Sequence, residues 1–100
     1  MATTSKALFR GAASTSNTTL YTVPSATTAI VTNIVVTNTS TSSATFTLNL
    51  NGTAIQSAST IAANSSAYFD LKQVLAATQT ISGSASAVTV NFHISGVEVA

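Results

Sequence analysis

Few side chains in this sequence could carry out acid–base or nucleophilic chemistry. His93 is the only histidine among 100 residues, and Asp70 and Glu98 are the only acids. A hydrolytic site needs a histidine that a carboxylate orients and that lies beside a nucleophile. No motif in the sequence combines these three groups. We therefore predict that His93 is a surface or interface residue and that the chain is not an enzyme.

Metal and cofactor sites are not indicated either. The chain has no cysteine, and its one histidine and two acids do not show the close ligand spacing of structural metal sites. Its glycines are Gly11, Gly52, Gly83 and Gly96. They are scattered singly and none opens a helix, so no phosphate-binding loop is predicted. We expect neither a metal nor a cofactor.

Two tyrosines, Tyr21 and Tyr68, are the residues that could stack on a sugar ring. A carbohydrate site usually surrounds such a ring with acids and amides. Only Asn and Thr are available in the sequence context to orient a sugar hydroxyl. A lectin-like site is therefore the less favoured interpretation.

Charge is scarce along the whole chain. Charged residues make up 5% of the sequence and the net charge is +1, whereas designed soluble surfaces carry about 25–35%. No cluster could neutralise several phosphates, so nucleic acid is not an expected partner. The charged residues are Lys6, Arg10, Asp70, Lys72 and Glu98.

The sequence contains no candidate membrane span or secretion signal. Thr and Asn interrupt every apolar run before it reaches the roughly 18 residues of a transmembrane helix. The stretch MATTSKALFRGAAST has neither a charged n-region nor an apolar h-region. A neutral surface rich in hydroxyls costs less to desolvate than a charged one, and cyclic homo-oligomers are the usual outcome of self-association. We therefore expect the protein to associate with copies of itself.

Period-two alternation is the dominant structural signal, and it is clearest over Ala44–Leu50. Phe46 and Leu48 alternate there with Thr47 and Asn49, which predicts a half-buried strand. The strand ends at Asn51-Gly52, a dipeptide typical of tight hairpins, so residues 53–56 are predicted to return beside it.

Residues 28–38 place apolar side chains on both faces of a predicted strand. Ile30, Ile34 and Val36 would share one face, and Val31 and Val35 the other. This pattern is typical of a central strand or of one whose second face meets a partner. Val31 and Val35 are therefore candidate interface residues.

In the second half, residues 67–71 alternate and the following LKQVLAATQ favours at most a single helical turn or a loop. Strands are predicted over residues 78–84 and 87–99, with Val88 on the same face as Val90. Near the end the apolar positions move out of phase, which predicts a β-bulge at Ser95-Gly96.

Seven or eight short strands separated by turns predict an all-β fold, a single antiparallel β-sandwich over residues 13–100. Jelly-roll and immunoglobulin-like topologies both remain open. Residues 1–12 form either an amino-terminal arm or a first edge strand, which would cover residues 6–11. As an arm they would dock on a neighbour through four candidate residues, Lys6, Leu8, Phe9 and Arg10.

Several segments together resemble small β-rich virion proteins encoded among the structural genes of tailed bacteriophages. They are LFRGAASTS, TTLYTVPSATTAIVTNIVVTNTS, SATFTLNLNG, DLKQVLAATQTISGSAS and VNFHISGVEVA. The most specific part is LYTVP, Leu20 to Pro24. In many relatives a glycine replaces Ser25 or Ala26, so this turn departs from the pattern.

The resemblance implies a non-enzymatic structural role in the virion, with assembly in the host cytoplasm. A head decoration or minor capsid protein that stabilises the capsid is the first expectation. The partners would be copies of the chain itself, as a trimer, and the major capsid protein or tail proteins. The alternative is a tail or tail-fibre module that binds a host receptor or glycan.

Overall fold

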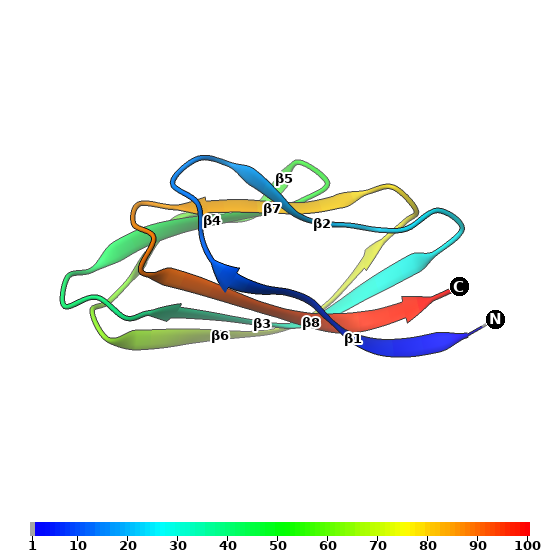
Figure 1. Cartoon of the computed structure of the whole chain (residues 1–100), viewed down its shortest axis with the longest axis horizontal. Helices are drawn as coiled ribbons and strands as arrows, with labels where there is room; N and C mark the ends of the chain where they lie inside the picture. Colours follow the sequence, from blue (N-terminus) through cyan, green and yellow to red (C-terminus); the bar gives the residue numbers. More distant parts are fainter. Residues whose placement is uncertain (1) are drawn as a thin grey trace.

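Eight β-strands make up the regular structure of residues 2–100, the residues that the computed structural model describes. They form two antiparallel sheets of four strands, ordered β1-β8-β3-β6 and β2-β7-β4-β5, which lie as two layers (Figure 1). The predicted all-β sandwich is confirmed. The strands are β1 (Thr3–Ala12), β2 (Thr18–Thr22), β3 (Thr28–Asn38), β4 (Ala44–Leu50), β5 (Thr53–Ile61), β6 (Ser65–Leu75), β7 (Thr80–Ala85) and β8 (Val90–Val99).

The pairing of the strands selects one of the two topologies that the sequence leaves open. β1 pairs with β8, β2 with β7, β3 with β6 and β4 with β5, all antiparallel. This is a long hairpin wound into two sheets, the arrangement of an eight-stranded jelly roll. The fold is therefore a jelly roll and not an immunoglobulin-like sandwich.

The core lies between the two sheets and is built from one face of each. Phe46, Leu48 and Ile81 come from one sheet, and Ile34 and Phe92 from the other, and all are almost fully buried. Burial of such side chains is the main source of stability, at about 25 cal/mol for each Å² of apolar surface removed from water.

The Asn51-Gly52 hairpin is confirmed. Leu50 pairs with Thr53, and the two residues between them have positive φ angles of 49° and 79°. These angles match a two-residue hairpin turn. Another positive φ, 56°, lies at Ala26 in the turn after Pro24, and this left-handed conformation favours glycine.

The prediction for the two faces of β3 is wrong because the strand contains a bulge. Thr32 is an extra residue in the pairing of β3 with β8, between Val31 and Asn33. The bulge moves Val31 to the same side as Ile34, where its side chain is fully buried. Ile30 consequently faces outward, together with Val35.

The predicted bulge at Ser95-Gly96 is also wrong, because the extra residues lie in the neighbouring strands. β8 runs regularly through Ser95 and Gly96, while β3 has its extra residue at Thr32 and β1 at Leu8. Gly96 is required by close packing: a Cβ atom there would collide with the carbonyl oxygen of Ile30. The apolar positions of the sequence change phase near Gly96 because the register of β1 and β3 shifts there by one residue relative to β8, which continues without a bulge.

Two further local predictions fail. LKQVLAATQ does not start a helical turn, because residues 71–75 continue β6 and Leu75 is buried opposite Ala29. Val88 lies in a turn before β8 and is 64% exposed, so it does not share the core face of Val90. For β6, pairing with a strand distant in the sequence overrides the local pattern. For Val88, a local turn does so, closed by the hydrogen bond from the Val90 N–H to the Ala87 carbonyl oxygen.

Residues 3–12 form an edge strand of the sandwich. β1 pairs with β8 from Thr3, opposite Val99, to Ala12, opposite Asn91. Leu8 belongs to the buried core and Phe9 packs against it. This segment thus forms one of the two edge strands of the sheet, and the side chains of Leu8 and Phe9 point into the molecule.

Candidate functional site

The structure divides the six candidate interface residues into three groups. Leu8, Phe9 and Val31 pack in or against the core of their own domain. Their apolar character is therefore explained by packing within the domain and not by docking. Lys6 forms an ion pair within the chain. Arg10 and Val35 remain on the outer surface of the β1-β8-β3-β6 sheet.

Arg10 and Val35 belong to one row that crosses all four strands of this sheet. The register places Arg10 opposite His93, His93 opposite Val35, and Val35 opposite Tyr68. Residues in one row of antiparallel strands point to the same side. Tyr68 is 73% exposed. His93 is therefore a surface residue beside a cation and an aliphatic side chain, with no acid in its row.

A second row on the same side is apolar. Val97 lies opposite Ile30, and Ile30 lies opposite Val74, which is 65% exposed. We call this whole outer surface the Val35 face. It is defined by Arg10, His93, Val35 and Tyr68 in one row, Ser95, Asn33 and Asp70 in the next, and Val97, Ile30 and Val74 in the third.

The outer surface of the other sheet has a different composition. Its central pair of strands presents Thr47 opposite Ser84 and Asn49 opposite Ser82. We call this surface the Thr47 face. It offers hydroxyls and amides and no aliphatic side chain in these rows. Thr47, Asn49 and Ser84 remain partly exposed to water, while Ser82 is buried against Asn49. Only the Val35 face combines aliphatic, aromatic and charged side chains.

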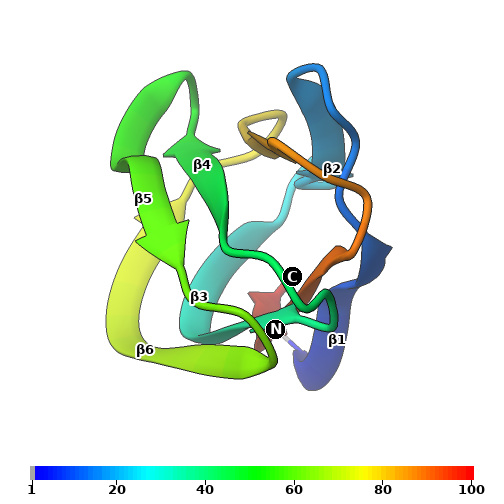
Figure 2. The same ribbon diagram turned by 90° about the vertical axis from the view of Figure 1, so that its left-hand side faces the viewer.

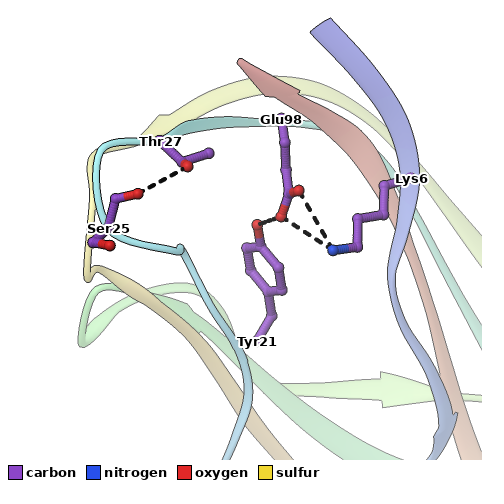
Figure 3. A network of polar contacts seen from close by, with 5 residues as sticks. All are labelled: Lys6, Tyr21, Ser25, Thr27 and Glu98. Carbon is purple, nitrogen blue, oxygen red and sulfur yellow. Dashed lines mark hydrogen bonds and ion pairs between the residues drawn. The ribbon is translucent and has the colours of Figure 1, made fainter. Parts of the chain in front are cut away.

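A polar network joins the two sheets inside one end of the sandwich (Figure 3). Tyr21 of β2 donates a hydrogen bond to the Glu98 carboxylate of β8, and Lys6 Nζ of β1 lies 3.4 Å from both carboxylate oxygens. Tyr21 is buried, so it cannot serve with Tyr68 as a sugar-stacking platform. The two tyrosines also belong to different sheets.

The network shifts the ionisation of two of its members. Burial, followed by the hydrogen bond to Glu98 and its charge, raises the pKa of the Tyr21 hydroxyl above its ordinary 10.0. The hydrogen bond from Tyr21 lowers the pKa of the Glu98 carboxyl, with a further contribution from Lys6, against the opposing effect of desolvation. The network connects β2 of one sheet with β1 and β8 of the other, and so links the two sheets.

A cleft of about 360 Å³ opens between the edge strands β5 and β6, which lie on the same side of the sandwich (Figure 2). Its apolar lining includes Leu48 and Ile55, and its polar lining includes Gln56, Asp70 and Gln73. Tyr68 contributes as well. Sequence reasoning missed this group of amides beside a tyrosine, because β5 and β6 meet only through the packing of the two sheets.

Two other classes of site have no candidate in the described part of the chain. Within residues 2–100, no three His, Cys, Asp or Glu side chains are grouped so that they could hold a metal ion. The same residues contain no helix of the length and apolarity needed to cross a membrane. Searches against protein-family models and against curated proteins found no match.

Proposed function

We propose that this protein is a non-enzymatic structural component of a tailed-bacteriophage particle, a head decoration or minor capsid protein that acts by self-association. The resemblance of the sequence supports the class of particle, and implies a trimer with capsid or tail proteins as further partners. The jelly roll, a fold found in viral capsid domains and in lectins, agrees with it at the level of analogy.

The observation that carries the proposal is the contrast between the two outer faces. Ile30, Val35 and Val97 lie on central strands of the Val35 face and remain partly exposed. Their burial in an interface would be favourable, at about 25 cal/mol for each Å². The charged residues of this face, Arg10, Asp70 and Lys72, lie on the edge strands β1 and β6, so the apolar side chains of the central strands can be buried without desolvating a charge between them.

Light scattering of the purified protein tests self-association. The wild type should be larger than a monomer, and Ile30→Asp should dissociate it by leaving an unpaired charge in an apolar contact. Thr47→Asp is the matched control, since it places the same side chain on a central strand of the opposite face. It should leave both the assembly and the melting temperature nearly unchanged.

A monomeric wild type at tens of micromolar that also fails to bind capsids would refute the proposal. If Thr47→Asp dissociates the assembly and Ile30→Asp does not, self-association stands but uses the other face. Imaging the intact particle then decides between head and tail.

One observation favours a second function, a tail or tail-fibre module that binds a host receptor or glycan. The cleft between β5 and β6 brings Gln56, Gln73 and Asp70 together near Tyr68, and amides and acids around an aromatic ring suit sugar hydroxyls. Saturable glycan binding that Tyr68→Ala abolishes would support this function. A glycan array without any signal would count against it.

A further inference from the structure

We propose that two copies of this chain pack with their Val35 faces together, related by a two-fold axis parallel to the strands, so that Arg10 of each copy meets Asp70 of the other. The inference rests on the proposed self-association. It differs from the trimer that the resemblance implies: the partner is one second copy, the symmetry is two-fold, and Arg10 and Asp70 determine the orientation.

The distribution of charge is the first step. Lys6 and Glu98 form the only ion pair among residues 2–100, so three of the five charged side chains are left without an ionic partner in this part of the molecule. Arg10 lies on edge strand β1, and Asp70 and Lys72 lie on the opposite edge strand β6. The nearest contact of the Asp70 carboxylate is the amide of Asn33, at 3.5 Å. Arg10 and Asp70 are thus opposite charges at opposite edges of one face.

The order of the strands makes this face self-complementary. A two-fold axis that runs between β8 and β3, parallel to them, places β1 of one copy over β6 of the other. Rotation about this axis leaves the position of each residue along the strand direction unchanged, so each row faces the same row of the second copy. Arg10 then lies over Tyr68 of the second copy, one row from Asp70, and the contact occurs twice. Both an ion pair and a cation–π contact are available to the guanidinium there. A two-fold axis across the strands would instead place β1 over β1, where Arg10 would meet no acid.

The same operation matches the remaining rows. Ile30 of β3 lies over Val97 of β8 in the second copy, so the apolar row packs against its own equivalent. About ten residues per strand and four strands, at about 3.4 Å rise and about 4.8 Å spacing, give roughly 600 Å² for each copy. The total of roughly 1,200 Å² is at the lower limit of stable interfaces. A second copy is therefore a sufficient partner for this face.

Charge reversal tests the contact. Arg10→Glu alone and Asp70→Lys alone should each weaken the dimer at least tenfold, because each sets like charges against one another. An equimolar mixture of the two variants should restore a dimer with one copy of each. In that dimer the two introduced charges face each other with opposite signs, and the unchanged Asp70 of one copy faces the unchanged Arg10 of the other. Sedimentation velocity measures all three samples.

Thr47→Glu is the control for these variants. It introduces the same side chain as Arg10→Glu on the opposite outer face, and it should leave the dimer intact. Circular dichroism of each variant shows that the fold is retained.

The outcomes separate this inference from the function on which it rests. Restoration in the mixture supports the two-fold contact. A head-to-tail trimer would not be restored, because in a ring of three copies two neighbours must carry the same variant. A mixture that stays dissociated therefore overturns the two-fold contact. Dissociation by neither variant also overturns it while leaving self-association in place. A monomeric wild type defeats both proposals.

Discussion

At the scale of single residues, Glu98 is the acid that contacts both a tyrosine and a lysine. Its neighbours Val97 and Val99 face outward, so the carboxylate points between the sheets toward Tyr21 and Lys6. A carboxyl whose pKa is lowered by folding stabilises the protein above its unfolded pKa, and that contribution is lost as the pH falls through the folded pKa. For Glu98 the loss begins below about 4.5, its ordinary value.

Tyr21 has the opposite dependence. Its pKa is raised by folding, so its contribution is complete below the ordinary value of 10.0 and is lost as the pH rises above it. The hydrogen bond between the two groups therefore stabilises the protein only between an acid limit set by Glu98 and an alkaline limit set by Tyr21.

Tyr21→Phe should reveal this window. At neutral pH the variant should melt a few degrees below the wild type, because Glu98 loses the donor that most favours its charged form. The difference should shrink at both extremes, as Glu98 becomes protonated or Tyr21 ionises. Thermal melts from about pH 2 to about pH 11 measure it. Tyr68→Phe, at an exposed tyrosine, is the control, and a difference for Tyr21→Phe that stays constant with pH would contradict the explanation.

At the scale of elements, the pairing of β1 favours the edge-strand interpretation of residues 1–12 over the docking arm. The strand pairs with β8 over its whole length and contributes Leu8 to the core. Deleting residues 1–12 should therefore lower the melting temperature strongly or abolish cooperative melting. The deletion exposes the edge of β8 and removes Leu8 from the core, and loss of a buried leucine side chain alone lowers the free energy of unfolding by about 2–5 kcal/mol.

Thr4→Ala is the control for this deletion, since it changes an exposed residue of the same strand without touching the core or the Val35 face. Its melting temperature should remain within a degree or two of the wild type. If the truncated protein instead melts like the wild type and only fails to assemble, residues 1–12 act as a docking arm. Circular dichroism and light scattering on the same samples distinguish these results.

The elements that the sequence predicts well are those whose pattern is local. β4 and its Asn51-Gly52 turn combine strict alternation with a dipeptide that favours positive φ, so neither needs information from distant residues. The bulges at Thr32 and Leu8 are different. The phase change near Gly96 is visible in the sequence, but which strand takes the extra residue depends on how β1, β8 and β3 pack together. For the same reason Val31 is predicted on the wrong face.

At the scale of the whole molecule, both outer faces are built from strands that are distant in the sequence. The row from Arg10 to Tyr68 needs β1, β8, β3 and β6 in that order. Composition predicts a neutral surface suited to association, but it cannot say that the aliphatic side chains gather on one sheet and the hydroxyls on the other. That division follows from the jelly-roll pairing, which no local pattern encodes.

The same pairing joins the two ends of the chain. Ala2 and Ala100 exchange both backbone hydrogen bonds, at 2.9 Å each, and the ends of the chain lie together in Figure 1. The same pair of hydrogen bonds joins the two residues that flank the turn in a two-residue β-hairpin. An Asn-Gly linker from Ala100 to Ala2 would therefore turn β8 and β1 into a hairpin, in a permuted chain that opens between the exposed residues Ser16 and Asn17.

We expect this circular permutant to fold several-fold faster than the natural order of strands. Pairing of β1 with β8 is among the most distant contacts of the chain, and the permutation makes it local, which lowers the contact order. Stopped-flow refolding measures the rate, and light scattering should show the same assembly as the wild type, because the Val35 face is unchanged. A permutant opened at the same place but joined by a long Gly-Ser linker is the control and should gain less. Equal refolding rates for all three proteins would mean that β1 docks after the rate-limiting step, on a sandwich already formed by the other strands.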